Sequence, residues 1–239
     1  MGKIGKIAIL SDIHGNSMAL SAVLVQIKKQ EIDSAIILGD FIGYYHRPHE
    51  VMAMLMGSGL HITAVRGNHE QMLSEILQGQ KNWSDINTKY GHGLWLAYNL
   101  LSTNALEALL GLPMDEKMTL GKYKISLSHE ATMAGKSYVY PDSNYDDIDF
   151  SACNADIIMM GHTHYPMIGI VQGRLLVNPG SVGQSRRYGG VAEWAVLYTE
   201  TGMVVPQYTP YDVQAVMDDC HLYDENVSYL IEVLQRRGL

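Results

Sequence analysis

The stretch IAILSDIHGN (Ile7–Asn16) begins with a short apolar run and ends on polar residues, among them Asp12 and His14. The same pattern recurs in AIILGD (Ala35–Asp40), ITAVRGNHE (Ile62–Glu70), KISLSHE (Lys124–Glu130) and DIIMMGHTH (Asp156–His164). Each run is rich in Ile, Val, Leu or Met, which is typical of strands buried on both faces of a sheet. The sequence therefore predicts an α/β fold in which five strands each end on polar side chains.

These polar residues are expected to meet, because ligands of open α/β sheets bind beyond the carboxyl ends of the strands. The residues concerned are Asp12, His14, Asp40, Asn68, His69, His129, His162 and His164. Two Asp, one Asn and five His exceed the needs of one structural metal and suit two catalytic ions. Imidazole and carboxylate ligands without a thiolate suit Mn, Fe, Zn or Ni.

The composition is that of an ordinary globular protein. The chain has 239 residues, of which 47% are hydrophobic and 18% charged, and a formal net charge of −8. An acidic balance argues against long nucleic acid and anionic membranes as partners, because both favour a basic surface. No shift in composition and no internal repeat marks a boundary, so residues 1–239 are predicted to form a single domain.

A cytoplasmic location is expected. Two cysteines, Cys153 and Cys220, cannot build a disulfide framework. The N-terminal residues turn polar at Ser11 and lack the apolar core of a signal peptide. No apolar stretch approaches the length of a membrane span. The sequence leaves the oligomeric state open.

Further elements follow from helical periodicity, caps and turn residues. Helices are predicted over Ser17–Lys29, from Pro48 to near Gly57, over Glu70–Leu112 with breaks at Gly91 and Gly93, and over Asp212–Leu239. Hairpins are predicted from Ile168–Val171 with Arg174–Val177, and from Glu193–Tyr198 with Met203–Tyr208.

The acidic, Tyr-rich segment Ser137–Phe150 follows directly after the fourth polar end. It has two interpretations. It is either a solvated surface loop or a substrate lid in which Tyr138, Tyr140 or Tyr145 stacks on a base or aryl group.

The order DIH, GD, GNHE, a His after a strand, and GHTH resembles the calcineurin-like metallophosphoesterase superfamily. More narrowly, GDFIGYYHRPHE (Gly39–Glu50), VRGNHE (Val65–Glu70) and NPGSVGQSR (Asn178–Arg186) resemble a small single-domain prokaryotic, phosphodiesterase-like branch. That branch shows GDxxGYGPxP, RGNHD and NPGSVGQPR. The resemblance implies a four-layer αββα sandwich with a dinuclear metal site at the carboxyl ends of the strands.

The resemblance also implies a role for each polar residue. One metal would take Asp12, His14 and His164, the other Asn68, His129 and His162, with Asp40 bridging the two. His69 would stay off the metals and stabilise or protonate the leaving-group oxygen. The implied reaction is hydrolysis of small phosphodiesters or phosphomonoesters, nucleotide-like ones included, by attack of a metal-bridging hydroxide.

The chain departs from the branch beside these ligands. Glu70 replaces Asp, Glu130 replaces Gly, Tyr45-His46 replaces Gly-Pro, and Ser185 replaces Pro. Glu70 is expected either to hold His69 less well or to point elsewhere. Such departures bear on the substrate class more than on the reaction type. Candidate substrate contacts are Arg186, Arg47 and Tyr140, since guanidinium suits phosphate and a phenol ring can stack.

Two alternatives stay open. A protein Ser/Thr phosphatase shares GNHE but needs GDxVDRG, and Gly43 and Tyr44 stand where its Asp and Arg would be. A non-catalytic scaffold on the same fold usually lacks a ligand or the leaving-group histidine, and here all are present.

Overall fold

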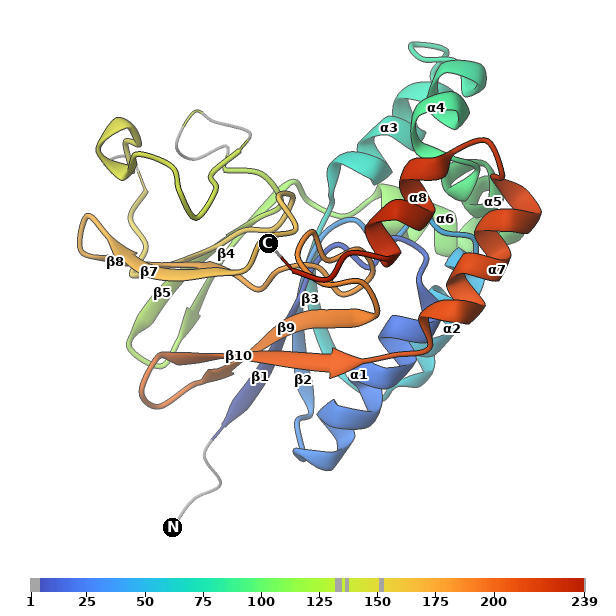
Figure 1. The fold of residues 1–239 in the computed structure, drawn as a ribbon. Helices are drawn as coiled ribbons and strands as arrows, with labels where there is room; N and C mark the ends of the chain where they lie inside the picture. The colour runs from blue at the N-terminus through green and yellow to red at the C-terminus, as the bar shows by residue number, and fades with distance from the viewer. Residues whose placement is uncertain (1–4, 132–134, 136–137, 151–152, 239) are drawn as a thin grey trace.

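Two five-stranded sheets pack face to face in the computed structural model, which describes residues 5–238 apart from 132–134, 136–137 and 151–152 (Figure 1). The first sheet has the order β10-β9-β1-β2-β3, with β10 Met203–Pro210, β9 Val191–Tyr198, β1 Lys6–Leu10, β2 Ser34–Leu38 and β3 His61–Val65. The second has the order β4-β5-β6-β8-β7, with β4 Asp115–Leu120, β5 Tyr123–Ser128, β6 Ile157–Met159, β8 Arg174–Asn178 and β7 Met167–Val171. Strands β1, β2 and β3 are parallel, as are β5, β6 and β8.

Alternate residues of the central strands fill two different cores. Ile7 and Ile9 of β1 face the second sheet, where Leu127 belongs to the same buried cluster. Ala8 and Leu10 belong to the cluster on the helical side of the first sheet. The predicted burial on both faces is thus confirmed for β1. It is wrong for β3, where His61 and Ile62 are exposed because this strand lies at the edge of its sheet.

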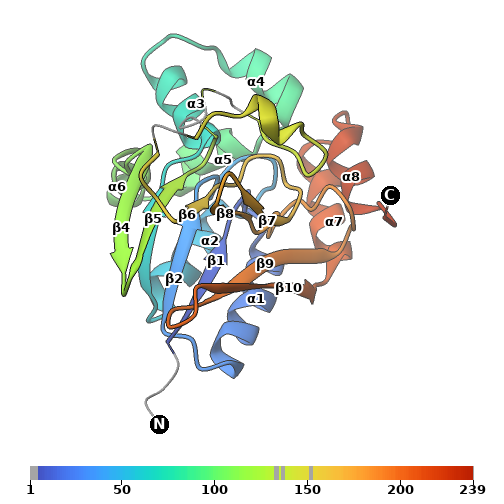
Figure 2. The same cartoon turned by 90° about the vertical axis from the view of Figure 1, so that its left-hand side faces the viewer.

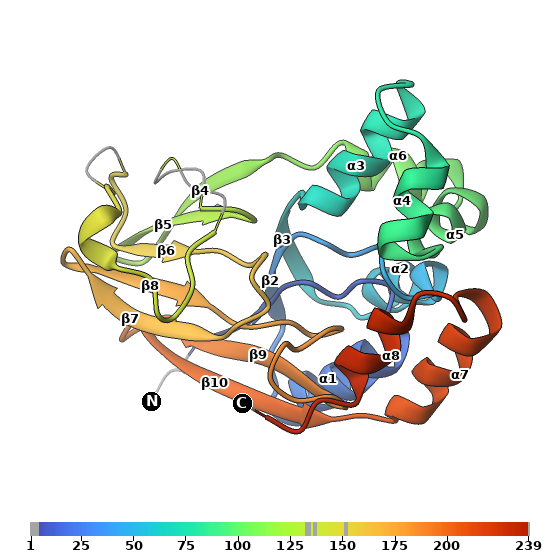
Figure 3. The same cartoon turned by 45° about the horizontal axis from the view of Figure 1, so that its top comes forward.

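The helices are α1 Ser17–Lys29, α2 Pro48–Gly57, α3 Asn68–Leu77, α4 Trp83–Tyr90, α5 Gly93–Leu100, α6 Thr103–Leu110, α7 Val213–Tyr223 and α8 Ser228–Leu234. Helix α1 begins as predicted, with the Asn16 side chain accepting a hydrogen bond from the Ala19 N–H. Figure 3 shows α7 and α8, in red, beside α1 at one end of the first sheet.

The outer face of the second sheet is covered by the segment 138–150, which includes the 3₁₀ turn η2 (Tyr145–Asp147) and lies toward the viewer in Figure 2, in yellow. Phe150 and Ile148 of this segment pack with Ile158 and Met160. The predicted α/β sandwich with its layered sheets and helices is therefore confirmed.

Three local predictions need correction. The C-terminal helix is interrupted after Tyr223 and resumes at Ser228, because the carboxylate of Asp224 binds other elements. The long helical region has a further break between α3 and α4, and strand β4 was not anticipated. Both predicted hairpins are present, as β7–β8 and β9–β10.

Asp224 connects the end of α7 to two distant segments. Its Oδ2 accepts hydrogen bonds from His46 Nε2, at 2.6 Å, and from the His92 backbone N–H, at 2.8 Å. Its Oδ1 accepts one from His92 Nδ1, at 2.6 Å. Gly91 has φ +78, and a Cβ there would lie 2.7 Å from Asp224 Oδ2. His46 is thus a buried structural residue, and this network fixes the loop that follows β2.

Glu70 joins the end of β2 to the start of α3. Its carboxylate accepts four hydrogen bonds of 2.9–3.2 Å from the backbone N–H groups of Asp40, Phe41, Ile42 and Gly67. Burial and the nearby Asp40 charge raise the pKa of Glu70 to about 7. Four N–H donors stabilise the ionised form of this carboxylate. A cation bound beside Asp40 would neutralise the Asp40 charge, which is the second cause of the raised pKa of Glu70. Of the two expected positions for Glu70, the structure shows the one that points away from the His69 ring.

We expect Asp224→Asn to lower the free energy of unfolding by about 1–3 kcal/mol at neutral pH, because three donor groups lose a charged acceptor. Burial acts to raise the pKa of Asp224, but the bonds from His46 and His92 bring it below its usual value. A carboxyl with a lowered folded-state pKa stabilises the fold above its unfolded value, about pH 4, and this contribution is lost as pH falls through the folded value. Urea unfolding at several pH values should therefore show the variant and wild type converging below about pH 4. An equal effect from the exposed Asp218→Asn, or a difference independent of pH, would contradict this.

We expect Glu70→Asp, which restores the residue of the branch, to cost about 1–3 kcal/mol of stability. The shorter side chain cannot reach all four amides, so at least one buried N–H is left without its acceptor. Chemical denaturation measures the loss, and Glu107→Asp on an exposed helical face is the matched control. A variant as stable as wild type would show that the four hydrogen bonds contribute nothing.

Candidate metal centre

The predicted polar residues come from five chain segments that end at the same edge of the two sheets. Asp12 and His14 follow β1, Asp40 follows β2, and Asn68 and His69 begin α3. His129 follows β5, and His162 and His164 follow β6. The structure brings six of these side chains together in two adjoining clusters, with Asp40 between the clusters and His69 beside them.

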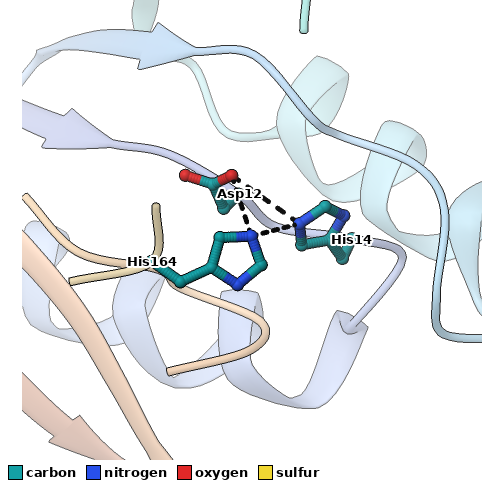
Figure 4. Close-up of side chains that lie close together, drawn as sticks. All are labelled: Asp12, His14 and His164. Atoms are coloured by element: carbon teal, nitrogen blue, oxygen red, sulfur yellow. Dashed lines mark hydrogen bonds and ion pairs between the residues drawn. The ribbon is translucent and has the colours of Figure 1, made fainter. Parts of the chain in front are cut away.

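The first cluster contains Asp12, His14 and His164, whose side chains point toward one another (Figure 4). His14 Nε2 and His164 Nε2 are 2.9 Å apart. Asp12 Oδ1 lies 3.1 Å from His164 Nε2 and 3.7 Å from His14 Nε2. One carboxylate oxygen and two imidazole nitrogens thus surround a single point.

The second cluster contains Asn68, His129 and His162. Asn68 Oδ1 lies 2.9 Å from His129 Nε2 and 2.8 Å from His162 Nδ1, and these two nitrogens are 3.2 Å apart. Asp40 lies between the clusters, with Oδ2 at 3.3 Å from His129 Nε2 and 3.7 Å from His14 Nε2. One carboxylate oxygen of Asp40 thus lies within 4 Å of an imidazole nitrogen from each cluster.

The chemistry of these residues fits divalent cations. The side chains of Asp12, His14, Asp40, His129 and His164 are all at most 3% exposed. Asp12 Oδ1 is buried without a hydrogen-bond donor. Two buried carboxylates facing imidazole nitrogens are costly unless a cation compensates them. The set of carboxylate, imidazole and amide oxygen ligands suits borderline metals such as Mn, Fe, Zn and Ni.

Three of the imidazoles are oriented by backbone carbonyls. His14 Nδ1 donates to Ile42 O at 3.2 Å, and His129 Nδ1 donates to Leu38 O at 2.6 Å. His164 Nδ1 donates to Gln184 O at 2.8 Å. Each bond leaves Nε2 as the nitrogen that carries a lone pair and faces the cluster, which is the usual arrangement of histidines that bind metals.

Electrostatics keep both carboxylates ionised. Burial acts to raise the pKa of Asp12, but His164, His14 and His129 hold it well below its usual range. The pKa of Asp40 is likewise low, because His129 and His69 outweigh the effect of burial. Burial lowers the pKa of His164 to about 4, so this imidazole is neutral at pH 7. Burial also acts to lower the pKa of His129, but the Asp40 and Asp12 carboxylates raise it to about 10, so His129 must release a proton to bind a metal. Ionised carboxylates and neutral imidazoles are the forms that bind metals.

The backbone at these positions is strained. Asp12, His14, Asp40, His162 and His164 all have positive φ, between 51° and 68°. Residues other than glycine rarely adopt this region, and it concentrates at functional sites. These sharp turns after β1, β2 and β6 direct the side chains of these residues toward the clusters.

His69 lies beside the clusters under aromatic cover. Its ring is packed among those of Tyr44, Tyr90 and His14, with centroids 4.7, 5.3 and 4.7 Å away. Gly43 is required here, because a Cβ would meet the His69 ring. The backbone N–H of His69 donates to Asp40, whereas its Nδ1 is buried without a partner. Burial lowers the pKa of His69 to about 3.

A pocket of about 130 Å³ opens above the clusters. It is lined by Asp40, Asn68, His69, His162, Thr163, His164, Arg186 and the tyrosines 44, 90, 138, 140 and 165. Arg186 and Tyr140 thus lie where the sequence placed substrate contacts. The Arg186 guanidinium lies over the Tyr229 ring of α8, 5.4 Å from its centroid, and its backbone carbonyl accepts a hydrogen bond from Arg236.

The prediction that Arg47 contacts the substrate needs correction, because its guanidinium lies outside this pocket. Its Nε donates to Asp219 Oδ2 at 2.6 Å and its Nη2 to Asp219 Oδ1 at 3.1 Å. Tyr145 is also directed elsewhere, donating to Pro141 O at 3.0 Å. Of the predicted lid, Tyr138 and Tyr140 reach the pocket, and Ser137 lies outside the described residues.

Sequence reasoning missed two tyrosines in the wall. Tyr165 follows GHTH directly, and this adjacency was an available signal. Tyr90 ends α4 and comes near His69 only through the packing of α4, which no sequence pattern revealed.

Within the described part of the chain, no helix has the length and apolar character needed to span a membrane.

Comparisons with known proteins agree with this geometry. A family model described as the calcineurin-like phosphoesterase superfamily domain matches residues 6–202. An uncharacterized protein of Methanocaldococcus jannaschii is 32% identical over 199 residues, which are 75% of this chain and 77% of that protein.

Solved structures share the fold. A hypothetical protein from Pyrococcus horikoshii has a TM-score of 0.80 at 20% identity over 98% of both chains. A metallophosphoesterase from Sphaerobacter thermophilus has a TM-score of 0.73 at 24% identity, over 96% of this chain and 99% of that one. Since the family model spans all the strand ends that carry the clustered side chains, this protein belongs to the calcineurin-like phosphoesterase superfamily.

Proposed function

We propose that the protein is a metal-dependent phosphoesterase that hydrolyses small phosphodiesters or phosphomonoesters. The observation that supports this most is the position of Asp40, between two clusters of metal-type ligands on the floor of a pocket that also contains His69. A structural metal site would need neither the second cluster nor a buried histidine beside it.

The residues have distinct parts in this proposal. One cation would be held by Asp12, His14 and His164, and the other by Asn68, His129 and His162. Asp40 would contribute a ligand to both cations. Two divalent cations held there would act as Lewis acids on the phosphoryl oxygens and lower the pKa of a water molecule.

His69 and Arg186 act on the ester itself. His69 faces the pocket beside the Asp40 side of the centre. Because burial lowers its pKa to about 3, the imidazole is neutral at pH 7, and the one N–H that it carries would stabilise or protonate the leaving-group oxygen. Arg186 supplies a guanidinium to the pocket lining near His164, where it would position a phosphoryl oxygen. Gly43 and Tyr44 keep the His69 ring in place.

The small volume of the pocket and its tyrosine walls favour a small ester that carries a flat group, such as a nucleotide-like or aryl ester. A protein Ser/Thr phosphatase is less well supported, because Gly43 and Tyr44 pack on His69 where that family's Asp and Arg would stand. A non-catalytic scaffold would release no phosphate from any model ester in the presence of Mn²⁺.

The test combines elemental analysis with a substrate panel. We expect the protein with Mn²⁺, Ni²⁺ or Zn²⁺ to hydrolyse bis-p-nitrophenyl phosphate, p-nitrophenyl phosphate, cyclic nucleotides or dinucleoside polyphosphates. Asp40→Asn should lose metal from both clusters and fall below about 1% of wild-type turnover, because both cations lose a charged ligand. The exposed Asp218→Asn serves as the control. A fully active Asp40→Asn, or wild type inactive on the whole panel, would refute the proposal.

His69→Ala should keep both metals, because His69 is not needed as a ligand in this assignment. Turnover should fall by about 10²–10⁴-fold on alkyl esters, whose leaving groups need a proton, and much less on p-nitrophenyl esters. Parallel kinetics with the two kinds of ester measure the difference, with the exposed His221→Ala as the control. Equal losses on both kinds of ester would contradict the role as a general acid.

A further inference from the structure

The fourth imidazole of the centre differs from the other three. His14, His129 and His164 each donate their outer ring nitrogen to a backbone carbonyl. His162 instead turns Nδ1 toward Asn68, so its outer nitrogen is Nε2. This atom is buried and has no hydrogen-bond partner in the described part of the chain.

One carboxylate faces this nitrogen. Glu130 Oε1 lies 4.0 Å from His162 Nε2, and the Glu130 side chain is 28% exposed. The gap is longer than a hydrogen bond, but a partly exposed side chain is free to close it by a change of rotamer. Glu130 stands where the prokaryotic branch has Gly, so a glycine there would offer no side-chain acceptor. Tyr138 lies against the same imidazole, with centroids 4.5 Å apart.

We propose that Glu130 is a positioning residue for the second cation: its carboxylate accepts the Nε2–H of His162 and fixes the ring tautomer whose Nδ1 lone pair faces Asn68 and His129. The inference rests on the proposed metal-binding role of this cluster. Carboxylate partners of this kind orient histidine ligands, and their loss typically weakens metal binding about 10–100-fold. The residue that departs from the branch thus gives His162 the partner that backbone carbonyls give the other imidazoles.

The test is metal binding to the metal-free protein, which needs no turnover. Mn²⁺ is titrated by calorimetry or chelator competition into wild type, Glu130→Gln, Glu130→Gly and the control Glu107→Gln. We expect Glu130→Gly to weaken one of two sites about 10–100-fold and Glu130→Gln to weaken it less, because an amide oxygen still accepts a hydrogen bond. The other site and the control should match wild type.

A spectroscopic readout tests the hydrogen bond itself. In protein labelled with ¹⁵N-histidine and loaded with Zn²⁺, His162 should show a slowly exchanging Nε2–H that is lost in Glu130→Gly. The inference would be overturned by unchanged metal binding in both variants or by equal weakening of both sites. Total loss of one metal in Glu130→Gln would also overturn it, because Glu130 would then be a direct ligand. Two bound Mn²⁺ ions, only one of which is weakened by loss of Glu130, in a protein inactive on every ester would refute the proposed function and leave this inference intact.

Discussion

The placement of Asp40 is the constraint on which the rest of the site depends. Its Oδ1 accepts the N–H of His69, its Oδ2 faces both clusters, and its own N–H donates to Glu70. Gly67 packs so closely that a Cβ would meet the Asp40 carboxylate. The end of β2 and the start of α3 are therefore one rigid unit. A shift in this carboxylate would therefore reach both clusters and His69 together, and several buried hydrogen bonds converge on this short stretch of backbone.

Much of this centre could be predicted from the sequence, because parallel strands deliver their carboxyl ends to one edge whatever the details of packing. The apolar runs before Asp12, Asp40, His129 and His162 were sufficient for that. The predictions that were wrong concerned side chains whose partners are distant in the sequence. Arg47 pairs with a residue 172 positions away, and no local pattern announces such a pair. The grouping of the ligands followed from the family resemblance; local patterns alone left it open.

The departures from the branch are explained by the partners that the side chains find. Glu70 is long enough to reach amides of two segments, His46 binds Asp224, and Glu130 approaches His162. None of these partners is adjacent in sequence except within α3. Each substitution is thus tied to another part of the chain, and the departures are better understood as connections within this protein than as lost features of the branch.

The C-terminal helices α7 and α8 lie beyond residue 202, where the family match ends, yet Tyr229 and Arg236 support Arg186 and Asp224 secures the loop that carries Tyr44. The segment that matches the family model is therefore shorter than the part of the chain that packs around the pocket. A shortened protein cut where the family match ends would keep every residue that lines the pocket, but it would lose the side chains that pack against Arg186 and hold the loop after β2. Comparing relatives by the shared segment alone would overlook the helices of this chain that pack behind the pocket wall.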